Sequence, residues 1–349
     1  MNPYPNGYGP PYGAPNNPWQ NNPYLSQEYQ DKKKIHRTGN VLGLALLGVV
    51  ALNTLLMLIY SAIYYLVLPK LMYGPNYHIV RQFAVWFQQG YSIFMYLVSF
   101  LLPFLLYMIV IKMPFKAALP MHKGKKSTFL LAIPIAMGVT VVSSFISTYL
   151  SALLEKLGVG MSTPDISMPS GVVSSILYIL STAILPALVE EFAIRGVVMQ
   201  SLRRFGDGFA LITSSILFAV LHSTLAQVPT AFLMGLCIGY FVLRTGNIWC
   251  GVAIHFCNNA FALVLNFAID HTLVQYQNMA ILLTYGVLLI GAVIAAVVYF
   301  SRTSNAFRLA PSPIALAEGK KYQALFVSAP MIIALVLLVM EIVSSLYWI

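Results

Sequence analysis

The sequence predicts an all-α fold, a polytopic membrane bundle of about eight to nine transmembrane helices. Of the 349 residues, 59% are hydrophobic and only 9% are charged, against about 25% charged in a soluble domain. Apolar windows of about twenty residues, long enough to cross a bilayer core, recur along the chain. Lysines and arginines gather in alternate loops between these windows, which is the pattern of membrane topology. The chain is therefore not an ordinary soluble globule.

The amino-terminal segment differs from the rest in composition. Residues 1–38 are rich in Pro, Gly, Tyr and Asn and end in a basic cluster at 32–37. Such a composition cannot bury a core, so we expect a disordered cytoplasmic tail followed by a transmembrane domain over 39–349. Its prolines leave partner docking open as an alternative to a solvated leader. The first long apolar run exceeds the apolar region of a cleaved signal peptide, so it is expected to remain as a helix.

The transmembrane helices are expected in about nine apolar windows. They fall at roughly 41–69, 91–111, 127–152, 171–204, 209–226, 228–243, 247–268, 277–300 and 323–347. The window at 228–243 is short, so this helix is expected to be tilted or to span the membrane imperfectly. The amphipathic, aromatic segment 72–90 favours a helix that lies in the outer interface.

The placement of charge predicts the orientation in the membrane. Basic residues fill the loops on the side of the amino terminus, whereas the opposite loops hold little beyond Lys70, Arg81 and Lys156. We therefore expect a multi-pass protein of the plasma membrane, with its amino terminus in the cytoplasm and its carboxyl terminus outside. The net charge of +10 lies in these short loops, so the expected partner is the lipid bilayer and not nucleic acid.

Polar side chains interrupt the apolar windows between positions 185 and 259. They are Glu190, Glu191, Arg195, His222, His255 and Asn259. An ionisable side chain at mid-membrane costs roughly 2.5–3.5 kcal/mol on insertion scales. The set is therefore expected to face a shared polar cavity and to have a function.

Helix geometry divides this polar set into two parts. Residues four apart share a helix face, whereas neighbours are rotated by about 100°. Three pairs therefore share faces: Glu191 with Arg195, Phe218 with His222, and His255 with Asn259. Glu190 must point elsewhere than Glu191. One carboxylate is thus expected to be held by a guanidinium, and the other to be free for chemistry.

The turn at 203–208 predicts the depth of the site. Glu190 and His222 lie at nearly equal distances in sequence on either side of this turn. In an antiparallel hairpin they would meet on the order of 20 Å above it. His255, after the turn at 245–247, is nominally shallower, so a bent or shifted helix is expected to bring it alongside.

A buried glutamate beside a histidine can hold a water and take its proton. His255 and Asn259, with N–H donors on one helix face, can stabilise the oxyanion that forms when this water attacks a carbonyl. The chemistry that these residues predict is acyl hydrolysis. Because the substrate must reach a site inside the membrane, a peptide bond of a membrane-associated or lipidated chain is the natural target.

The same residues form three motifs of a known family. Positions 190–195 read EExxxR, positions 218–222 read FxxxH and positions 255–259 read HxxxN. In these motifs the segment 171–270 resembles the CAAX-protease and bacteriocin-processing family, also called Abi or type II CAAX prenyl endopeptidase-like. That family consists of intramembrane proteases of glutamic or metal-dependent type, and its spread suggests a bacterial host.

The resemblance implies a helical catalytic core at about 171–270 and a role for each motif residue. It implies that Glu190 and His222 activate water, and that His255 and Asn259 form the oxyanion hole. Glu191 and Arg195 would support the site or contact the substrate. Phe218 would pack so that it positions the neighbouring histidine. The identity of the substrate, and whether it is prenylated, stays open.

Zinc is the alternative to a metal-free site, with Glu190, His222 and His255 as its ligands. No tight ligand spacing demands the metal, so no cofactor is favoured. The three cysteines lie in apolar windows without CxxC or Cys/His spacing and are expected to be packing residues. The other polar pairs also have structural alternatives, an ion pair for Glu191 with Arg195 and interhelical hydrogen bonds for His255 with Asn259.

Signatures of other intramembrane proteases do not occur in the sequence. There is no HExxH of a zinc protease, no GxSG setting of a serine protease and no GxGD of an aspartic protease. A non-proteolytic membrane regulator or bacteriocin-immunity protein of the same fold is the alternative function, and it would not need Glu190 and His222 together. A proton-coupled transporter is a third interpretation, but the two halves show no paired repeats that would favour it.

Overall fold

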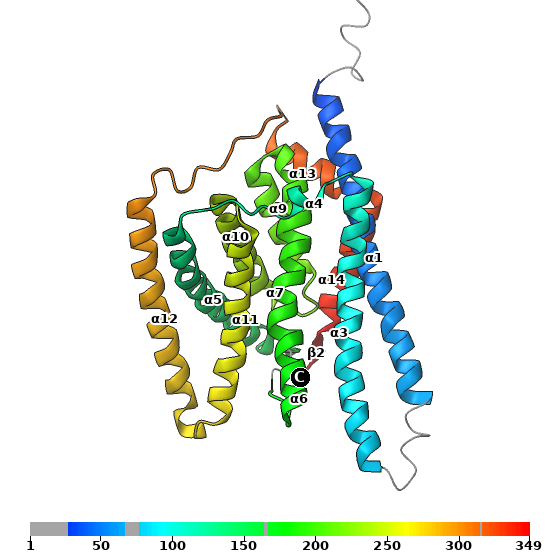
Figure 1. Cartoon of the computed structure of the whole chain (residues 1–349), viewed down its shortest axis with the longest axis vertical. Helices are drawn as coiled ribbons and strands as arrows, with labels where there is room; N and C mark the ends of the chain where they lie inside the picture. The colour runs from blue at the N-terminus through cyan, green and yellow to red at the C-terminus, as the bar shows by residue number, and fades with distance from the viewer. Residues whose placement is uncertain (1–26, 67–76, 164–166, 315) are drawn as a thin grey trace, which may run out of the picture.

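The structure, a computed structural model, is a bundle of long helices that run roughly along one axis (Figure 1). It describes residues 27–66, 77–163, 167–314 and 316–349. Within these residues seven helices are long and apolar enough to cross a membrane, and the bent pair α13 and α14 would make an eighth. The prediction of an all-α, multi-pass membrane bundle is confirmed.

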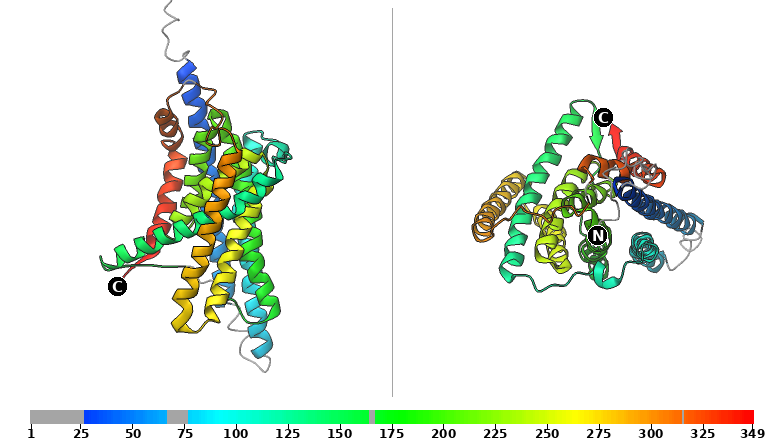
Figure 2. Two further views of the ribbon diagram at one scale, coloured as in Figure 1. Left: turned by 90° about the vertical axis from the view of Figure 1, so that its left-hand side faces the viewer. Right: turned by 90° about the horizontal axis from the view of Figure 1, so that it is seen from above.

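Three long helices form the first part of the bundle. α1 (Gln27–Leu66) and α3 (Tyr77–Val110) pack against each other, and α5 (Lys126–Glu155) crosses the bundle obliquely (Figure 2). The short helix α4 (Phe115–Ala118) lies in the loop between α3 and α5. Seen from above, α5 and the α1–α3 pair flank the central helices on two sides (Figure 2).

A continuous helical run occupies the centre. It consists of α6 (Val172–Ile179), η2 (Leu180–Ile184), α7 (Leu185–Glu190), η3 (Glu191–Met199), α8 (Gln200–Leu202) and η4 (Arg203–Phe205). η2 and η3 are π-helical, and π-helical turns inside helices occur frequently at functional sites. Pro186 in the first turn of α7 has no N–H to donate, which interrupts the α-helical hydrogen-bond ladder next to η2. The second change from α- to π-helix, from α7 to η3, falls between Glu190 and Glu191.

The next helix is shorter than predicted. The window at 209–226 was expected to span the membrane, but α9 (Asp207–Val220) has 14 residues. At 1.5 Å per residue it covers about 21 Å, less than the hydrocarbon core of about 30 Å. α10 (Val228–Thr245) then returns beside α9. The connection at 221–227 therefore lies at membrane depth, where irregular backbone is tolerated only inside protein or beside a polar cavity.

The remaining helices complete the bundle. α11 (Ile248–Asp270) and α12 (Val274–Arg302) are long, and α13 (Glu318–Phe326) meets α14 (Ala329–Ser344) at a bend of 80°. α14 packs closely on α1 at Gly43. A Cβ added to this glycine would lie only 2.3 Å from the backbone nitrogen of Met331. Beyond the expected helices, β1 (Val159–Met161) pairs antiparallel with β2 (Leu346–Trp348).

Two expectations about the first hundred residues are corrected. α1 begins at Gln27, so residues 27–38 are helical and not part of a disordered tail, whereas residues 1–26 lie outside the described residues. The physical reason is tertiary packing, because Asp31 and Ile35 are buried in this helix. The segment 72–90 is not a separate interfacial helix. From position 77 it forms the first part of α3, and Gln89 donates a hydrogen bond to the carbonyl of Ser174 in α6.

The basic loops lie together at one end of the bundle. The start of α1, the ends of α3, α10 and α12, the turn after η4 and helix α13 all lie at the top of Figure 1, and the carboxyl terminus lies in the lower half. The predicted alternation of basic and neutral loops therefore corresponds to two ends of the molecule. Which end faces the cytoplasm stays a prediction.

Candidate active site

A buried ion pair stands at the centre of the site. Glu191 Oε1 accepts a hydrogen bond of 3.0 Å from Arg195 Nη1, and both side chains are fully buried. The predicted face-sharing pair is confirmed. The same oxygen lies 2.9 Å from Nδ1 of His255 on α11. Glu191 therefore holds both a guanidinium and an imidazole.

The Arg195 guanidinium also contacts two further elements. Its Cζ atom lies 4.2 Å from the centroid of the Phe218 ring, and Nη2 donates to the carbonyl of Gly235 on α10 at 3.4 Å. The Phe218 ring in turn meets the rings of His222 and His255 edge-on, at centroid distances of 4.8 and 5.8 Å. Phe218 is thus a packing residue between the arginine and both histidines, which is the role predicted for it.

Glu190 has a different environment from Glu191. Tyr96 on α3 donates a hydrogen bond of 2.8 Å to Glu190 Oε1. The other oxygen, Oε2, is buried and accepts no hydrogen bond from the described residues, and it lies 3.7 Å from Nε2 of His255. As predicted, the two neighbouring carboxylates point in different directions. Glu191 is held by a guanidinium and Glu190 by a tyrosine, and in each carboxylate Oε2 is buried without a hydrogen-bond partner among the described residues.

His222 lies just after the end of α9, in the connection at membrane depth. Its Nδ1 is 2.8 Å from the carbonyl oxygen of Phe218, one turn earlier. When Nδ1–H donates to this carbonyl, Nε2 becomes the acceptor nitrogen. The short α9 thus ends two residues before this candidate histidine.

Glu190 and His222 lie between two cavities. The larger has a volume of about 470 Å³ and lies among α5, α7, α10 and α11, and the smaller, of about 290 Å³, lies among α1, α3 and α14. Both cavities are lined by Glu190, Phe218, His222 and Gln227. The predicted shared cavity is therefore present for Glu190, His222, His255 and Asn259, whereas Glu191 and Arg195 are fully buried and line neither cavity.

His255 and Asn259 both line the larger cavity. Asn258 Nδ2 donates to Asn259 Oδ1 at 3.1 Å, and Asn258 Oδ1 accepts from Thr140 of α5 at 2.7 Å. This chain of bonds orients the Asn259 amide, whose Nδ2 makes no hydrogen bond within the described residues. The predicted face-sharing pair is thus confirmed as a pair of cavity-lining side chains.

The close approach of α11 explains how His255 reaches both glutamates. The sequence predicted that a bent or shifted helix would be needed. A Cβ at Gly251, one turn before His255, would lie 2.8 Å from Glu191 Oε2. Only a residue without a side chain lets α11 pack this closely on η3. The π-helical geometry of η3 also shortens the central run, because more residues fill each turn.

A metal centre was the alternative for Glu190, His222 and His255. Within the part of the chain that the structure describes, no group of three His, Cys, Asp or Glu side chains is arranged to hold a metal ion. His255 Nδ1 is already bonded to Glu191, so only its Nε2 faces Glu190. The donors are of the types that zinc accepts, and their arrangement decides nothing about the reaction.

Comparison with known families bears on the same segment. Residues 172–261, about a quarter of the chain, match the family model described as type II CAAX prenyl endopeptidase Rce1-like. The resemblance to the CAAX-protease and bacteriocin-processing family is thereby confirmed. The matched segment runs from the start of α6 into α11 and contains all three motifs. None of the curated proteins and none of the solved structures matches the chain.

Sequence reasoning missed two contributors to the candidate site. Tyr96 is one of many aromatic residues in apolar windows, and nothing in its spacing distinguishes it. Gln227 lines both cavities, but it follows the predicted window. Glu341 of α14 accepts a hydrogen bond of 2.7 Å from Ser223 and lines the smaller cavity.

Proposed function

We propose that this protein is an intramembrane endopeptidase that hydrolyses a peptide bond of a membrane-associated or lipidated substrate. The observation that carries the proposal is that Glu190 lines the larger cavity together with His222, while its buried Oε2 has no hydrogen-bond partner within the described residues. A carboxylate oxygen without a partner in a buried site is costly unless something binds it. A water molecule in the cavity is the natural partner.

The reaction follows from the directions of these groups. Glu190 Oε2 takes a proton from the water while the water oxygen attacks the substrate carbonyl, and His222 Nε2 accepts a hydrogen bond that orients the water. The proton then passes from Glu190 to the leaving amine as the C–N bond breaks. The products are a carboxylic acid and an amine, so no further reactant is required.

The oxyanion of the tetrahedral intermediate would face α11. Asn259 Nδ2 is the proposed donor, and His255 Nε2 is a second donor when the ring is an imidazolium, because His255 Nδ1–H already donates to Glu191. Both side chains line the larger cavity together with Glu190. Glu191 and Arg195 have a positioning role in this scheme. Glu191 holds His255 Nδ1, which fixes the direction of its other nitrogen.

The larger cavity supports a peptide as the substrate. Its walls combine amide and hydroxyl groups, such as Asn258 and Thr140, with apolar side chains such as Met234 and Leu263. Such a lining suits an extended backbone with apolar side chains. We further infer a multi-pass plasma-membrane protein with a cytoplasmic amino terminus, an orientation supported by the basic end of the bundle.

Substrate trapping tests this function. Glu190→Gln keeps the size of the side chain and can still accept from Tyr96, but it cannot take a proton from water. We expect membrane peptides to accumulate in cells that carry Glu190→Gln or His222→Ala, relative to wild type, when membrane fractions are compared by mass spectrometry. Glu155→Gln, at the exposed end of α5, is the matched control and should behave as wild type.

Two measurements make the outcome decisive. The thermal unfolding of each purified variant in detergent shows whether it is folded. If folded Glu190→Gln leaves both the membrane peptides and the cellular activity of the protein unchanged, the peptidase proposal is wrong. The non-proteolytic regulator or immunity protein would then be the better interpretation.

A further inference from the structure

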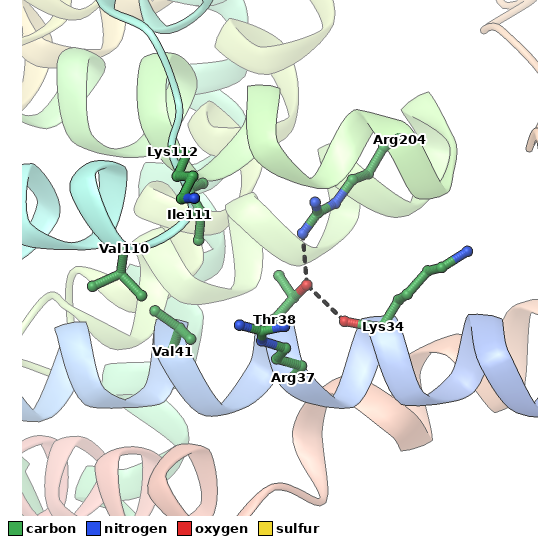
Figure 3. Close-up of a pocket in the computed structure, with 8 residues that line it drawn as sticks. All are labelled: Lys34, Arg37, Thr38, Val41, Val110, Ile111, Lys112 and Arg204. Carbon is green, nitrogen blue, oxygen red and sulfur yellow. Dashed lines mark hydrogen bonds between the residues drawn. The ribbon is translucent and has the colours of Figure 1, made fainter.

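A third cavity lies at the basic end of the bundle. It has a volume of about 390 Å³ and lies between the first turns of α1, the end of α3 and the turn at η4. None of its lining residues borders the two cavities of the candidate active site. We call it the basic pocket. Its lining residues are Lys34, Arg37, Thr38, Val41, Val110, Ile111, Lys112 and Arg204 (Figure 3).

Positive charge dominates the basic pocket. Four of its lining residues are cationic and none is acidic. Asp31 is the nearby acid, and its Oδ1 lies 3.2 Å from Lys34 Nζ. Arg37 and Lys112 make no side-chain hydrogen bond or ion pair within the described residues. The pocket therefore holds more positive charge than the described part of the protein neutralises.

The polar groups of the pocket are held in place by the fold. Arg204 Nη2 donates to Thr38 Oγ1 at 2.8 Å, and Thr38 Oγ1 donates to the carbonyl of Lys34 at 2.9 Å. Figure 3 shows Arg204 and Lys112 reaching the pocket from one side, and Lys34, Arg37 and Thr38 along α1 on the other. Three segments distant in sequence thus bring their cations to one place.

The backbone at Lys112 is unusual. This residue has a φ of +56°, in the left-handed region that favours glycine. Lys112 N bonds to the carbonyl of Ile109 and Met113 N to that of Met108, which is the hydrogen-bond pattern of a Schellman motif ending α3. A lysine therefore stands where glycine is usual, and the strained conformation directs a cation to the pocket.

We propose that the basic pocket binds the phosphate headgroup of an anionic phospholipid from the adjacent leaflet. Arginine and lysine donors suit phosphate oxygens, and basic pockets between membrane helices suit such headgroups. The apolar side of the pocket, formed by Val41, Val110 and Ile111, would contact the first methylene groups of the lipid. Free inorganic phosphate is also anionic, but it has no apolar part that would contact this side of the pocket. The bound lipid would join α1, α3 and η4.

Native mass spectrometry of the purified full-length protein tests this proposal. The detergent-solubilised protein is titrated with dioleoyl phosphatidylglycerol, with dioleoyl phosphatidylcholine, and with inorganic phosphate as a competitor. The pocket variant is Arg37→Gln with Lys112→Gln, because neither side chain makes a contact that the fold needs. The control is Lys116→Gln with Lys123→Gln, two exposed lysines at the same end that line none of the described cavities.

The expected result is saturable retention of phosphatidylglycerol by the wild type and the control, but not of phosphatidylcholine. Removal of two cations near the membrane surface is expected to weaken retention by roughly five- to thirtyfold in the pocket variant. Excess inorganic phosphate should not displace the lipid. Equal retention by the pocket and control variants would overturn the site. Displacement by phosphate at similar concentration, or equal retention of phosphatidylcholine, would overturn the assignment to an anionic lipid.

Discussion

Tyr96 donates a hydrogen bond of 2.8 Å to one oxygen of Glu190 and leaves the other oxygen unpaired at the cavity wall. The tyrosine comes from α3, outside the segment that carries the family motifs. Tyr96 lines the smaller cavity and not the larger one, in which we propose that the substrate binds. The proposed general base is therefore oriented by a residue that no motif contains.

Tyr96→Phe tests this orientation. A hydrogen bond to a charged group is worth about 1.5–3 kcal/mol, so kcat should fall by roughly 10- to 150-fold. KM should change little, because Tyr96 does not line the larger cavity. The measurement is the cleavage rate of the peptides that accumulate with Glu190→Gln. Tyr91→Phe on the same helix loses a bond of 2.7 Å to the carbonyl of Leu56 and should keep normal kcat. An equal loss in both variants would show a structural effect only.

The buried ion pair should contribute to stability far more than an exposed one. Arg195→Met leaves the Glu191 carboxylate buried without its guanidinium, and the expected cost is about 3–5 kcal/mol. Arg203→Met removes a partly exposed arginine from its 2.7 Å pair with Asp207, and the expected cost is about 0–1 kcal/mol. Thermal or denaturant unfolding in detergent measures both. Similar costs would mean that Glu191 is not isolated from water.

Gly251→Ala should disturb the contact between α11 and η3. The added Cβ would lie 2.8 Å from Glu191 Oε2, so the helix must shift and His255 must move with it. We expect a destabilisation of about 1–3 kcal/mol together with a loss of cleavage. Gly286→Ala on α12 is the matched control, since no atom of the described residues lies within 4 Å of its added Cβ. The control should be neutral or more stable by about 1 kcal/mol. Normal activity of Gly251→Ala would contradict the proposed packing.

Metal dependence can be tested separately. The metal-free mechanism predicts that 1,10-phenanthroline leaves cleavage unchanged and that the purified protein contains far less than one zinc per chain by elemental analysis. A zinc mechanism predicts stoichiometric zinc in the wild type and its loss in His222→Ala. Stoichiometric zinc together with inhibition by the chelator would replace the proposed glutamate mechanism.

The sequence predicted the motif contacts because they depend on local helical spacing. Glu191 with Arg195 is an example, since residues four apart meet in any helix. The sequence did not predict where α9 ends. Hydropathy averages over the polar residues that follow His222, whereas the helix stops where Ser223 bonds to Glu341 of α14 and the backbone of Leu225 bonds to Ser345. Both partners are more than a hundred residues away.

The contacts of Tyr96 and His255 show the same limit. Which aromatic residue meets Glu190 depends on how α3 packs against α7, and one sequence alone holds no measure of that packing. His255 was expected near the glutamates, but its position between both of them depends on Gly251. Glycine is frequent in transmembrane helices, so Gly251 does not stand out from the other glycines of the apolar windows.

The polar wall between the two cavities has a consequence for turnover. Every hydrolysis consumes a water molecule, and the lipid around the protein supplies almost none. The smaller cavity is lined by Asn53, Ser99 and Glu341, so it can hold water next to the reacting groups. A new water molecule can then reach Glu190 before the cleaved fragments have left the larger cavity.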